Sequence, residues 1–518
     1  MNTRSLFNLV ARVTTTLLLV QLSLPLMQVQ AAPVQRRGES PEQRTARYYE
    51  SIRNRPTQLL AFMRRMPKGG DLHSHLSGAI YAESYIKWAA EQGLCVNQTA
   101  MSFASCDQSP NQVPASTALT NGVLYRQLID GMSMRNWQLS GQSGHDHFFD
   151  AFSKFGAVSA TQIGAMIAEA AARAAKGRAG YLELMLTTDG GTASRIGNQV
   201  GWDGNHEGTL AKLKEAGISE SLVQSKNNLL KAEQEKDKLL QCGTSQADAG
   251  CKVVIRYIYQ VSRGAALGPV YAQMVAGFML ASEAGSKVVA LNLVQAEDGF
   301  SSMQNFTTQM KMLDFLHRQY PKANITLHAG ELAPGLVPPE GLTFHIRQSV
   351  MIGHANRIGH GVDIMNEDEP EELLREMARR NILVEICLTS NDVILGVRGK
   401  HHPLATYIEY GVPVALATDD EGVARSELTW EFMKAAEDQQ LSYIQLKTMA
   451  RNSLQYAFVS GSSLWLDSKR FTKVPQCAGD NPSRGVPTQA CRQFLSSSDK
   501  ARLQWALEED FSSFENRY

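Results

Sequence analysis

MPKGGDLHSHLSG (residues 66–78) contains the first of eight short apolar segments that decide the fold. Similar β-branched runs recur along the chain, and helix-like stretches separate most of them. The candidate strands are residues 71–76, 180–188, 252–261, 287–294, 324–331, 357–364, 382–391 and 413–420. The candidate helices are residues 161–177, 269–285, 303–319, 369–380 and 402–410. Apolar runs of this length are typical of parallel strands buried on both faces.

Eight strand–helix units predict an α/β protein with a closed (β/α)8 TIM barrel. A doubly wound open sheet is the alternative, but it would carry a Gly-rich phosphate turn after the first strand, and none is present. We assign the barrel to residues 67–456, with insertions at about 90–160 and 189–250. Residues 32–66 form a helical extension before it, and residues 457–518 form a C-terminal extension with a helical tail. Long insertions of this kind often form lids or partner-binding surfaces. The alternative is that they are solvent-exposed additions without a function of their own.

The N-terminus predicts export from the cytoplasm. Arg4 and Arg12 are followed by a mostly apolar stretch, residues 17–26, and by a small-residue cleavage pattern that ends at Ala31. These features predict a secretory signal peptide over residues 1–31, cut after Ala31, with a signal anchor as the alternative. No later segment has the 18 or so continuous apolar residues of a membrane span. We therefore expect a secreted or periplasmic protein without a stable membrane span after cleavage.

Cysteine usage fits an oxidising compartment. Six of the seven cysteines lie in close pairs, so local disulfides are the simplest interpretation, although sequence alone does not settle the connectivity. The pairs are Cys95 and Cys106, Cys242 and Cys251, and Cys477 and Cys491. Cys387 stands within the apolar run ILVEICL and is predicted to be a buried thiol.

The net charge of the chain indicates which kinds of partner it could bind. Lys and Arg number 51, and so do Asp and Glu, which gives a formal net charge of zero. Broad nucleic-acid binding needs a basic field, so we expect no nucleic-acid partner. A homodimer is one possible assembly.

The ends of four candidate strands carry the residues that suit catalysis. Active sites of such barrels lie where strands end, at the carboxyl face. The residues delivered there are His73 and His75 (first strand), His328 and Glu331 (fifth), His360 (sixth), and Asp419 and Asp420 (eighth). Each motif is weak alone, but their conjunction at four strand ends predicts one site.

Three imidazoles and a carboxylate form a ligand set that suits zinc and leaves a position for water. The predicted zinc ligands are His73, His75, His328 and Asp419. We expect His360 to orient or deprotonate the water, Glu331 to give a proton to the substrate, and Asp420 to hold the water or a ring nitrogen. The other histidines are interpreted as ordinary core, loop or surface residues: His145, His147, His206, His317, His345, His354, His401 and His402.

The motifs MPKGGDLHSHLSG, TLHAGE, RIGHG and ATDDEG, the last followed by ELTWEF, resemble the adenosine deaminase family of the amidohydrolase superfamily. Their order and spacing match over about residues 66–456. The export signal, N-terminal extension and cysteines resemble the secreted branch of that family.

The resemblance implies a single zinc ion per chain on a (β/α)8 barrel and hydrolytic deamination of adenosine, and of 2'-deoxyadenosine, to inosine and ammonia. The substrate would be a small-molecule purine nucleoside. The resemblance also implies that Glu331 protonates the purine ring nitrogen, that His360 assists the attacking hydroxide, and that Asp420 bonds the water and a purine nitrogen.

Some positions depart from the family pattern. Asn292 and Gln295 replace the usual Asp and Gly after the fourth strand, Ser77 replaces an Asp that meets the ribose, and Met185 replaces an Arg. The sequence CLTSN replaces a Cys-Pro pair. Gln295 and Ser77 are predicted to line the substrate pocket. We expect none of these departures to touch the metal or the acid, so they bear on the choice of purine. A deaminase of another aminopurine (modified adenosine, adenine or a nucleotide) and an extracellular binding or signalling protein remain alternatives.

Overall fold

The eight predicted strands form one parallel sheet that winds into a barrel. The strands follow in the order β1 (Gly69–His75), β5 (Ala179–Leu186), β6 (Val254–Ser262), β7 (Val288–Val294), β8 (Asn324–Ala329), β9 (Arg357–His360), β10 (Leu383–Ile386) and β11 (Val414–Leu416). The computed structural model describes residues 38–107, 109–483 and 485–518. The predicted signal peptide lies outside them. All elements below belong to the unit Pro41–Tyr518.

The barrel closes between its first and last strands through few contacts. Ser74 and Asp419 form an isolated parallel bridge, in which the His75 N–H donates to the Asp419 carbonyl (2.9 Å) and the Asp419 N–H donates to the His73 carbonyl (2.9 Å). The buried Asp71 carboxylate reinforces the seam by accepting from the Thr418 hydroxyl at 2.6 Å. The seam therefore lies beside the histidines of β1.

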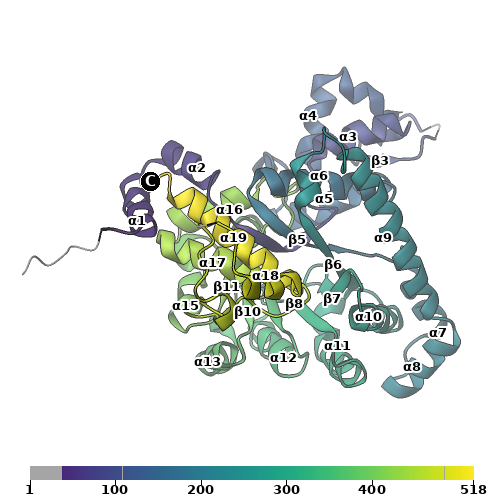
Figure 1. Ribbon diagram of the computed structural model, residues 1–518. Coiled ribbons are helices and arrows are strands. Elements are labelled where there is room, and N and C mark those ends of the chain that lie inside the picture. The colour runs from purple at the N-terminus through teal and green to yellow at the C-terminus, as the bar shows by residue number, and fades with distance from the viewer. Residues whose placement is uncertain (1–37, 108, 484) are drawn as a thin grey trace, which may run out of the picture. The chain divides into compact units, whose positions relative to one another are not determined.

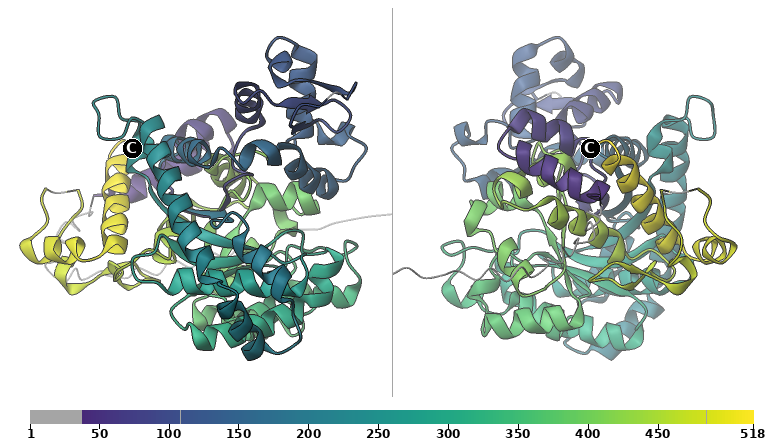
Figure 2. Two further views of the ribbon diagram at one scale, coloured as in Figure 1. Left: turned by 90° about the vertical axis from the view of Figure 1, so that its right-hand side faces the viewer. Right: turned by 60° about the vertical axis from the view of Figure 1, so that its left-hand side comes forward.

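Helices cover the outer face of the barrel, as Figures 1 and 2 show. They are α6 (Ile163–Lys176), α10 (Leu267–Ser282), α11 (Phe300–Gln319), α12 (His345–Met351), α13 (Pro370–Arg380), α15 (Leu404–Glu409), α16 (Leu428–Glu437) and α17 (Tyr443–Gln455). The helix α10 is apolar on all sides and nearly every residue in it is buried, because β6 and β7, α7 and α11 all pack against it.

Three predicted strands end four or five residues earlier than the sequence suggests. Residues 382–391 were predicted as one strand, but β10 ends at Ile386 and α14 (Leu388–Leu395) begins two residues later. The Glu431 carboxylate accepts from the Thr389 N–H (3.1 Å) and so stabilises the start of this helix. The strands predicted over 357–364 and 413–420 end at His360 and Leu416. The backbone is left-handed at His360 (φ 68°), which ends β9, and at Asp419 (φ 59°), beyond the end of β11.

The first insertion forms a small lobe at one end of the barrel (Figures 1 and 2). Its elements are α3 (Ala82–Glu91), the antiparallel strands β2 (Cys95–Asn97), β3 (Ser102–Ala104) and β4 (Gln112–Pro114), α4 (Gly122–Gly131) and α5 (Gly144–Ser159). The second insertion is α7 (Thr192–Val200), α8 (His206–Glu215) and α9 (Ser219–Leu239), with a left-handed Gly217 (φ 83°) between the last two.

The two ends of the described chain pack beside the barrel. They are α1 (Pro41–Ile52), α2 (Pro56–Met63), the hairpin β12 (Trp465–Asp467) and β13 (Thr472–Lys473), α18 (Gln489–Ser496) and α19 (Asp499–Glu515). The expected N-terminal and C-terminal helices are thus present. The α1 and α19 helices both contact α17.

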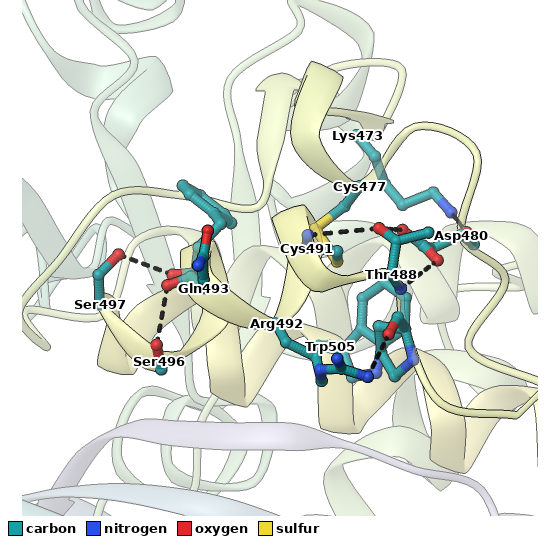
Figure 3. The surroundings of a disulfide bond; sticks show 12 residues. Lys473, Cys477, Asp480, Thr488, Cys491, Arg492, Gln493, Ser496, Ser497 and Trp505 are labelled. Carbon is teal, nitrogen blue, oxygen red and sulfur yellow. Dashed lines mark hydrogen bonds between the residues drawn. A yellow bond between two sulfur atoms is a disulfide. The ribbon is translucent and has the colours of Figure 1, made fainter.

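All three suspected disulfides are present, and Cys387 is a buried free thiol as predicted. Cys477–Cys491 joins the C-terminal loop to α18, where Asp480 accepts from both the N–H and the hydroxyl of Thr488 (Figure 3). Among the described residues, no helix is both long enough and apolar enough to cross a bilayer.

Candidate metal and active site

The four predicted zinc ligands converge at the carboxyl ends of three strands. His73 and His75 end β1, His328 lies in β8, and Asp419 follows β11. The His328 Nε2 atom lies 3.0 Å from the His73 Nε2 and 3.1 Å from the His75 Nε2. Asp419 Oδ1 lies 3.4 Å from each of the latter two nitrogens. One ligand atom from each residue lies within 4.8 Å of all the others, so a single cation could contact all four.

Partners behind the imidazoles turn their Nε2 lone pairs toward this common point. The His73 Nδ1–H donates to Glu385 Oε2 (2.6 Å), and the His328 Nδ1–H donates to Asn292 Oδ1 (2.9 Å). The Gln260 amide nitrogen lies 2.7 Å from His75 Nδ1. The acceptors at Nδ1 of His73 and His328 orient those two rings and leave their Nε2 atoms free to bind a metal. The donor set of three imidazoles and one carboxylate fits zinc.

The electrostatics of the cluster favour a cation. Burial opposes ionisation of Asp419, but the neighbouring imidazoles hold its pKa well below the usual range. Although burial acts against it, hydrogen bonds to Asp419 and Glu385 raise the pKa of His73 to about 10. Burial lowers the pKa of His75 to about 4. The site thus attracts positive charge, which a bound metal ion would supply in place of a proton.

The Glu385 carboxylate belongs to a buried ion-pair network across the barrel. Arg357 lies between Glu385 (2.6 Å) and Glu183 (2.5 Å), and all three side chains are no more than 1% exposed. Although burial opposes it, Arg357 and His73 hold the pKa of Glu385 below its usual value. The network keeps an ionised acceptor directly behind the ligand His73.

Glu331 has the properties of a proton donor. Its carboxyl is 7% exposed, and burial, with Asp419 nearby, raises its pKa well above the usual range. The turn that carries Glu331 is held by Glu297, which accepts from the N–H groups of Gly330 (3.1 Å) and Glu331 (2.8 Å). Burial therefore favours the protonated form of this carboxyl, and the turn holds it in a fixed position.

Asp420 is a second buried carboxyl at the site. Burial and the adjacent Asp419 raise its pKa well above the usual range, and its Oδ1 atom has no hydrogen-bond partner among the described residues. A Cβ atom at Gly78 would lie 1.5 Å from this oxygen. The glycine of the HLSG motif is therefore required for Asp420 to occupy its place.

His360 faces the same point with an unpartnered nitrogen. Its ring is fully buried, and its Nε2 atom lies 3.7 Å from Glu331 Oε1 and 4.0 Å from Asp419 Oδ2. The left-handed backbone at His360 and at Asp419 is unusual for residues with a Cβ atom, and such strain is typical of functional sites.

A cavity of about 480 Å³ opens beside the cluster, within the range of about 300–1,000 Å³ typical of small-molecule sites. The lining residues are His75, Ser77, Phe148, Phe149, Phe152, Gln260, Ser262, Val294, Gln295, Ala296, His328, Glu331, Asp419 and Asp420. The set contains three carboxyl groups but neither Lys nor Arg. The predicted pocket residues Ser77 and Gln295 both lie on its wall, and Gln295 has a left-handed φ of 83°.

Two of the positions that depart from the family pattern contact predicted metal ligands. Asn292 accepts from both the N–H and the Nδ1–H of the ligand His328, and its amide contacts Met185 Sδ at 3.3 Å. Ser390, in CLTSN, donates to Asp419 Oδ2 at 2.6 Å. These residues support the ligands from behind, because side chains on neighbouring strands of a barrel interdigitate in its interior.

Sequence reasoning also missed the supporting carboxylates and the wall of the pocket. Glu183 and Glu385 stand alone within apolar runs, YLELML and ILVEICL, and an isolated carboxylate in a buried strand is a usable signal for a buried ion pair. Phe148 and Phe152 come from α5 in the first insertion, and no local pattern connects them with the site.

Three histidines and an aspartate that converge at the carboxyl rim of a barrel form a site that could hold one metal ion. The family model described as adenosine deaminase matches residues 138–464, well over half of the chain, and the chain belongs to that family. The matched range includes His328, Glu331, His360, Asp419 and Asp420 but begins after His73 and His75.

Among curated proteins, adenosine deaminase from Enterococcus faecalis is 37% identical over 137 residues, which is 26% of this chain and 37% of that protein. Adenosine deaminase from Aliivibrio fischeri is 35% identical over 180 residues, 34% of this chain and 48% of the relative. The chain thus spans about half or less of the length of these relatives. The crystal structure of adenine deaminase from Arthrobacter aurescens is 18% identical, with a TM-score of 0.49, and covers 76% of this chain and 94% of that one.

Proposed function

We propose that this protein is a zinc-dependent hydrolase, active outside the cytoplasm, that deaminates adenosine and 2'-deoxyadenosine to inosine, or deoxyinosine, and ammonia. The observation that supports this most strongly is the convergence of His73, His75, His328 and Asp419 beside a cavity that also contains the buried carboxyl of Glu331, whose pKa is raised. The three disulfides support the extracytoplasmic location, because such bonds persist in oxidising compartments.

Zinc at this site would supply Lewis acidity and lower the pKa of the attacking water. Glu331 donates its proton to the purine ring nitrogen next to carbon 6, which makes that carbon electrophilic. The water oxygen forms a bond to carbon 6, and the bond from carbon 6 to the amino nitrogen breaks. Of the two protons of water, one restores Glu331 and the other completes the departing ammonia.

The lining of the pocket favours a nucleoside over a nucleotide. Asp419, Asp420 and Glu331 line the cavity, and no Lys or Arg is among its lining residues in the described part of the chain. A phosphate group would find neither a Lys nor an Arg among the described residues of this wall to bind it. The aromatic side chains of Phe148, Phe149 and Phe152 offer an apolar wall suited to a base or a ribose face.

The direct test is turnover by the zinc-loaded protein, followed by the change in ultraviolet absorbance. The panel is adenosine, deoxyadenosine, adenine, N6-methylated adenosine and adenylate. We expect adenosine and deoxyadenosine to react fastest and adenylate to react slowly. A preference for a methylated purine or for adenine would replace the nucleoside assignment with the second candidate, a deaminase of another aminopurine.

The role of Glu331 gives the first residue-level prediction. Glu331→Gln should lower kcat at least ~10²-fold, since general acid–base groups contribute about 10²–10⁴-fold, while zinc content stays at the wild-type level. Glu340→Gln, at an exposed position in the loop that follows, is the matched control and should behave as wild type. Full activity of the Glu331 variant would refute the assignment of the acid.

A further inference from the structure

A chain of buried polar groups lies behind His360, on the side away from the cavity. The Leu404 N–H donates to His402 Nδ1 (3.1 Å), His402 Nε2 contacts Asn391 Oδ1 (3.1 Å), and Asn391 Nδ2 contacts His360 Nδ1 (3.0 Å). Asn391 and His360 are fully buried, and His402 is 3% exposed. Neither Asn391 nor His402 lines the cavity.

The Leu404 N–H sets the direction of every hydrogen bond in this series of buried polar groups. A backbone N–H can only donate, so His402 Nδ1 is an acceptor without a proton. Burial lowers the pKa of His402 to about 4, so the ring is neutral and its single proton is on Nε2. That proton is donated to Asn391 Oδ1, which turns the NH2 end of the amide toward His360. The Asn391 amide then donates to His360 Nδ1.

His360 therefore has its own proton on the nitrogen that faces the reaction. Nδ1 accepts from Asn391, so in the neutral imidazole the proton is on Nε2. This is the nitrogen that has no partner among the described residues and lies near Glu331 and Asp419. In this state His360 can donate a hydrogen bond to an oxygen at the cluster, but it has no lone pair there with which to accept a proton.

We propose that the Leu404 N–H, His402 and Asn391 act as a tautomer-setting chain that makes His360 a hydrogen-bond donor to the attacking oxygen rather than its base. The inference rests on the proposed deaminase function and narrows the two roles expected for His360 to one. His402 and Asn391 are positioning residues. His360 keeps its proton throughout, and the protons of water go to Glu331 and to the departing nitrogen.

The tautomer is directly measurable. In zinc-loaded protein labelled with ¹⁵N-histidine, long-range ¹H–¹⁵N spectra distinguish a protonated Nε2 from a protonated Nδ1, and the missing signal in His360→Gln assigns the resonance. We expect the proton of His360 on Nε2 in the wild type. In Asn391→Asp, a carboxylate that can only accept should place a proton on Nδ1.

Activity should follow the tautomer. Asn391→Asp should lower kcat by about 10²–10³-fold, as removal of one donor to a developing oxyanion does, with KM changed less than about threefold. His402→Phe should have the same direction of effect, because it frees the Asn391 amide to rotate. His402→Gln, which retains one acceptor and one donor, should recover part of kcat. His401→Ala, at the exposed neighbouring position, is the control and should leave both readouts unchanged.

A proton on Nδ1 of His360 in the wild type would overturn the proposal, and so would wild-type kcat in a folded Asn391→Asp variant. The spectra need no substrate, so the wild-type tautomer decides the question even where a variant fails to fold. A protein that shows the Nε2–H tautomer but deaminates no purine would refute the proposed function and leave the tautomer-setting chain intact.

Discussion

Asn292 shows how one residue behind a ligand can matter as much as one in front of it. Its amide oxygen accepts from both the backbone N–H and the ring Nδ1–H of His328, and its amide nitrogen contacts the sulfur of Met185. An amide that is satisfied in this way is neutral and needs no counter-ion. The Asp that is usual at position 292 would be a buried carboxylate in need of a nearby cation, such as the Arg that is usual at position 185. Asn292 removes that need, so the uncharged Met185 can occupy the position.

The first prediction at this scale concerns metal affinity. Asn292→Ala removes the acceptor that orients His328, and loss of such partners weakens metal binding by about 10–100-fold. Competition with a zinc chelator measures the change. Asn324→Ala is the control, because Asn324 lies at the opposite end of β8 and its amide donates only to the Val289 carbonyl. Equal zinc affinity in Asn292→Ala and wild type would show that His328 needs no such support.

At the scale of elements, α5 brings a remote insertion to the site. The helix supplies the apolar wall of the cavity, and His145 at its N-terminus joins it to the loop after β7 through Asp298 (3.0 Å). The hydrogen bond to Asp298, with Asp146 adding to it, raises the pKa of His145 to about 9 against the effect of burial. The imidazolium therefore persists at neutral pH.

This contact predicts a pH-dependent contribution to stability. The folded-state pKa of His145 lies above its unfolded value of about 6.5, so the contribution is complete below about pH 6.5 and is lost as the pH rises through about 9. Because the site is partly open to solvent, we expect about 1 kcal/mol. The difference in unfolding free energy between wild type and His145→Gln should therefore be larger near about pH 6 than near about pH 10. A difference that is independent of pH would contradict it.

At the scale of the whole molecule, the ligand cluster lies across the weakest junction of the barrel. His73 and His75 belong to the first strand, Asp419 follows the last, and the two strands share an isolated bridge. The other neighbouring strands of the barrel pair through parallel ladders of two or more residue pairs. A metal ion bound by all four ligands would cross-link this seam.

Removal of zinc should therefore destabilise the protein and loosen the seam first. We expect Tm to fall by roughly 5–15 °C on chelation, as for loss of a ligand that binds only the folded state, and to recover with zinc but not with Mg²⁺. Hydrogen exchange at the amides of His75 and Asp419 should accelerate, while amides shared by β6 and β7 serve as the internal control. An unchanged Tm in the metal-free protein would exclude this stabilising role.

The fold and the ligands could be predicted from sequence because their signals are local. Each strand is a short apolar run, and period-two spacing puts His73 and His75 on one side of a strand. Strand ends could not be located as well, since the positive φ angle at His360 and the contact of Glu431 with the start of α14 are not contained in the local pattern.

By itself the sequence determined the barrel and the residues that converge at its carboxyl rim, because each strand and each motif at a strand end is a local signal within one segment. Only the tertiary structure decided that Asn292 supports His328, that α5 walls the cavity, and that His402 acts on His360 through Asn391. These contacts join segments that are far apart in the sequence. The burial of the residues and the direction of their hydrogen bonds are set only when those segments pack together.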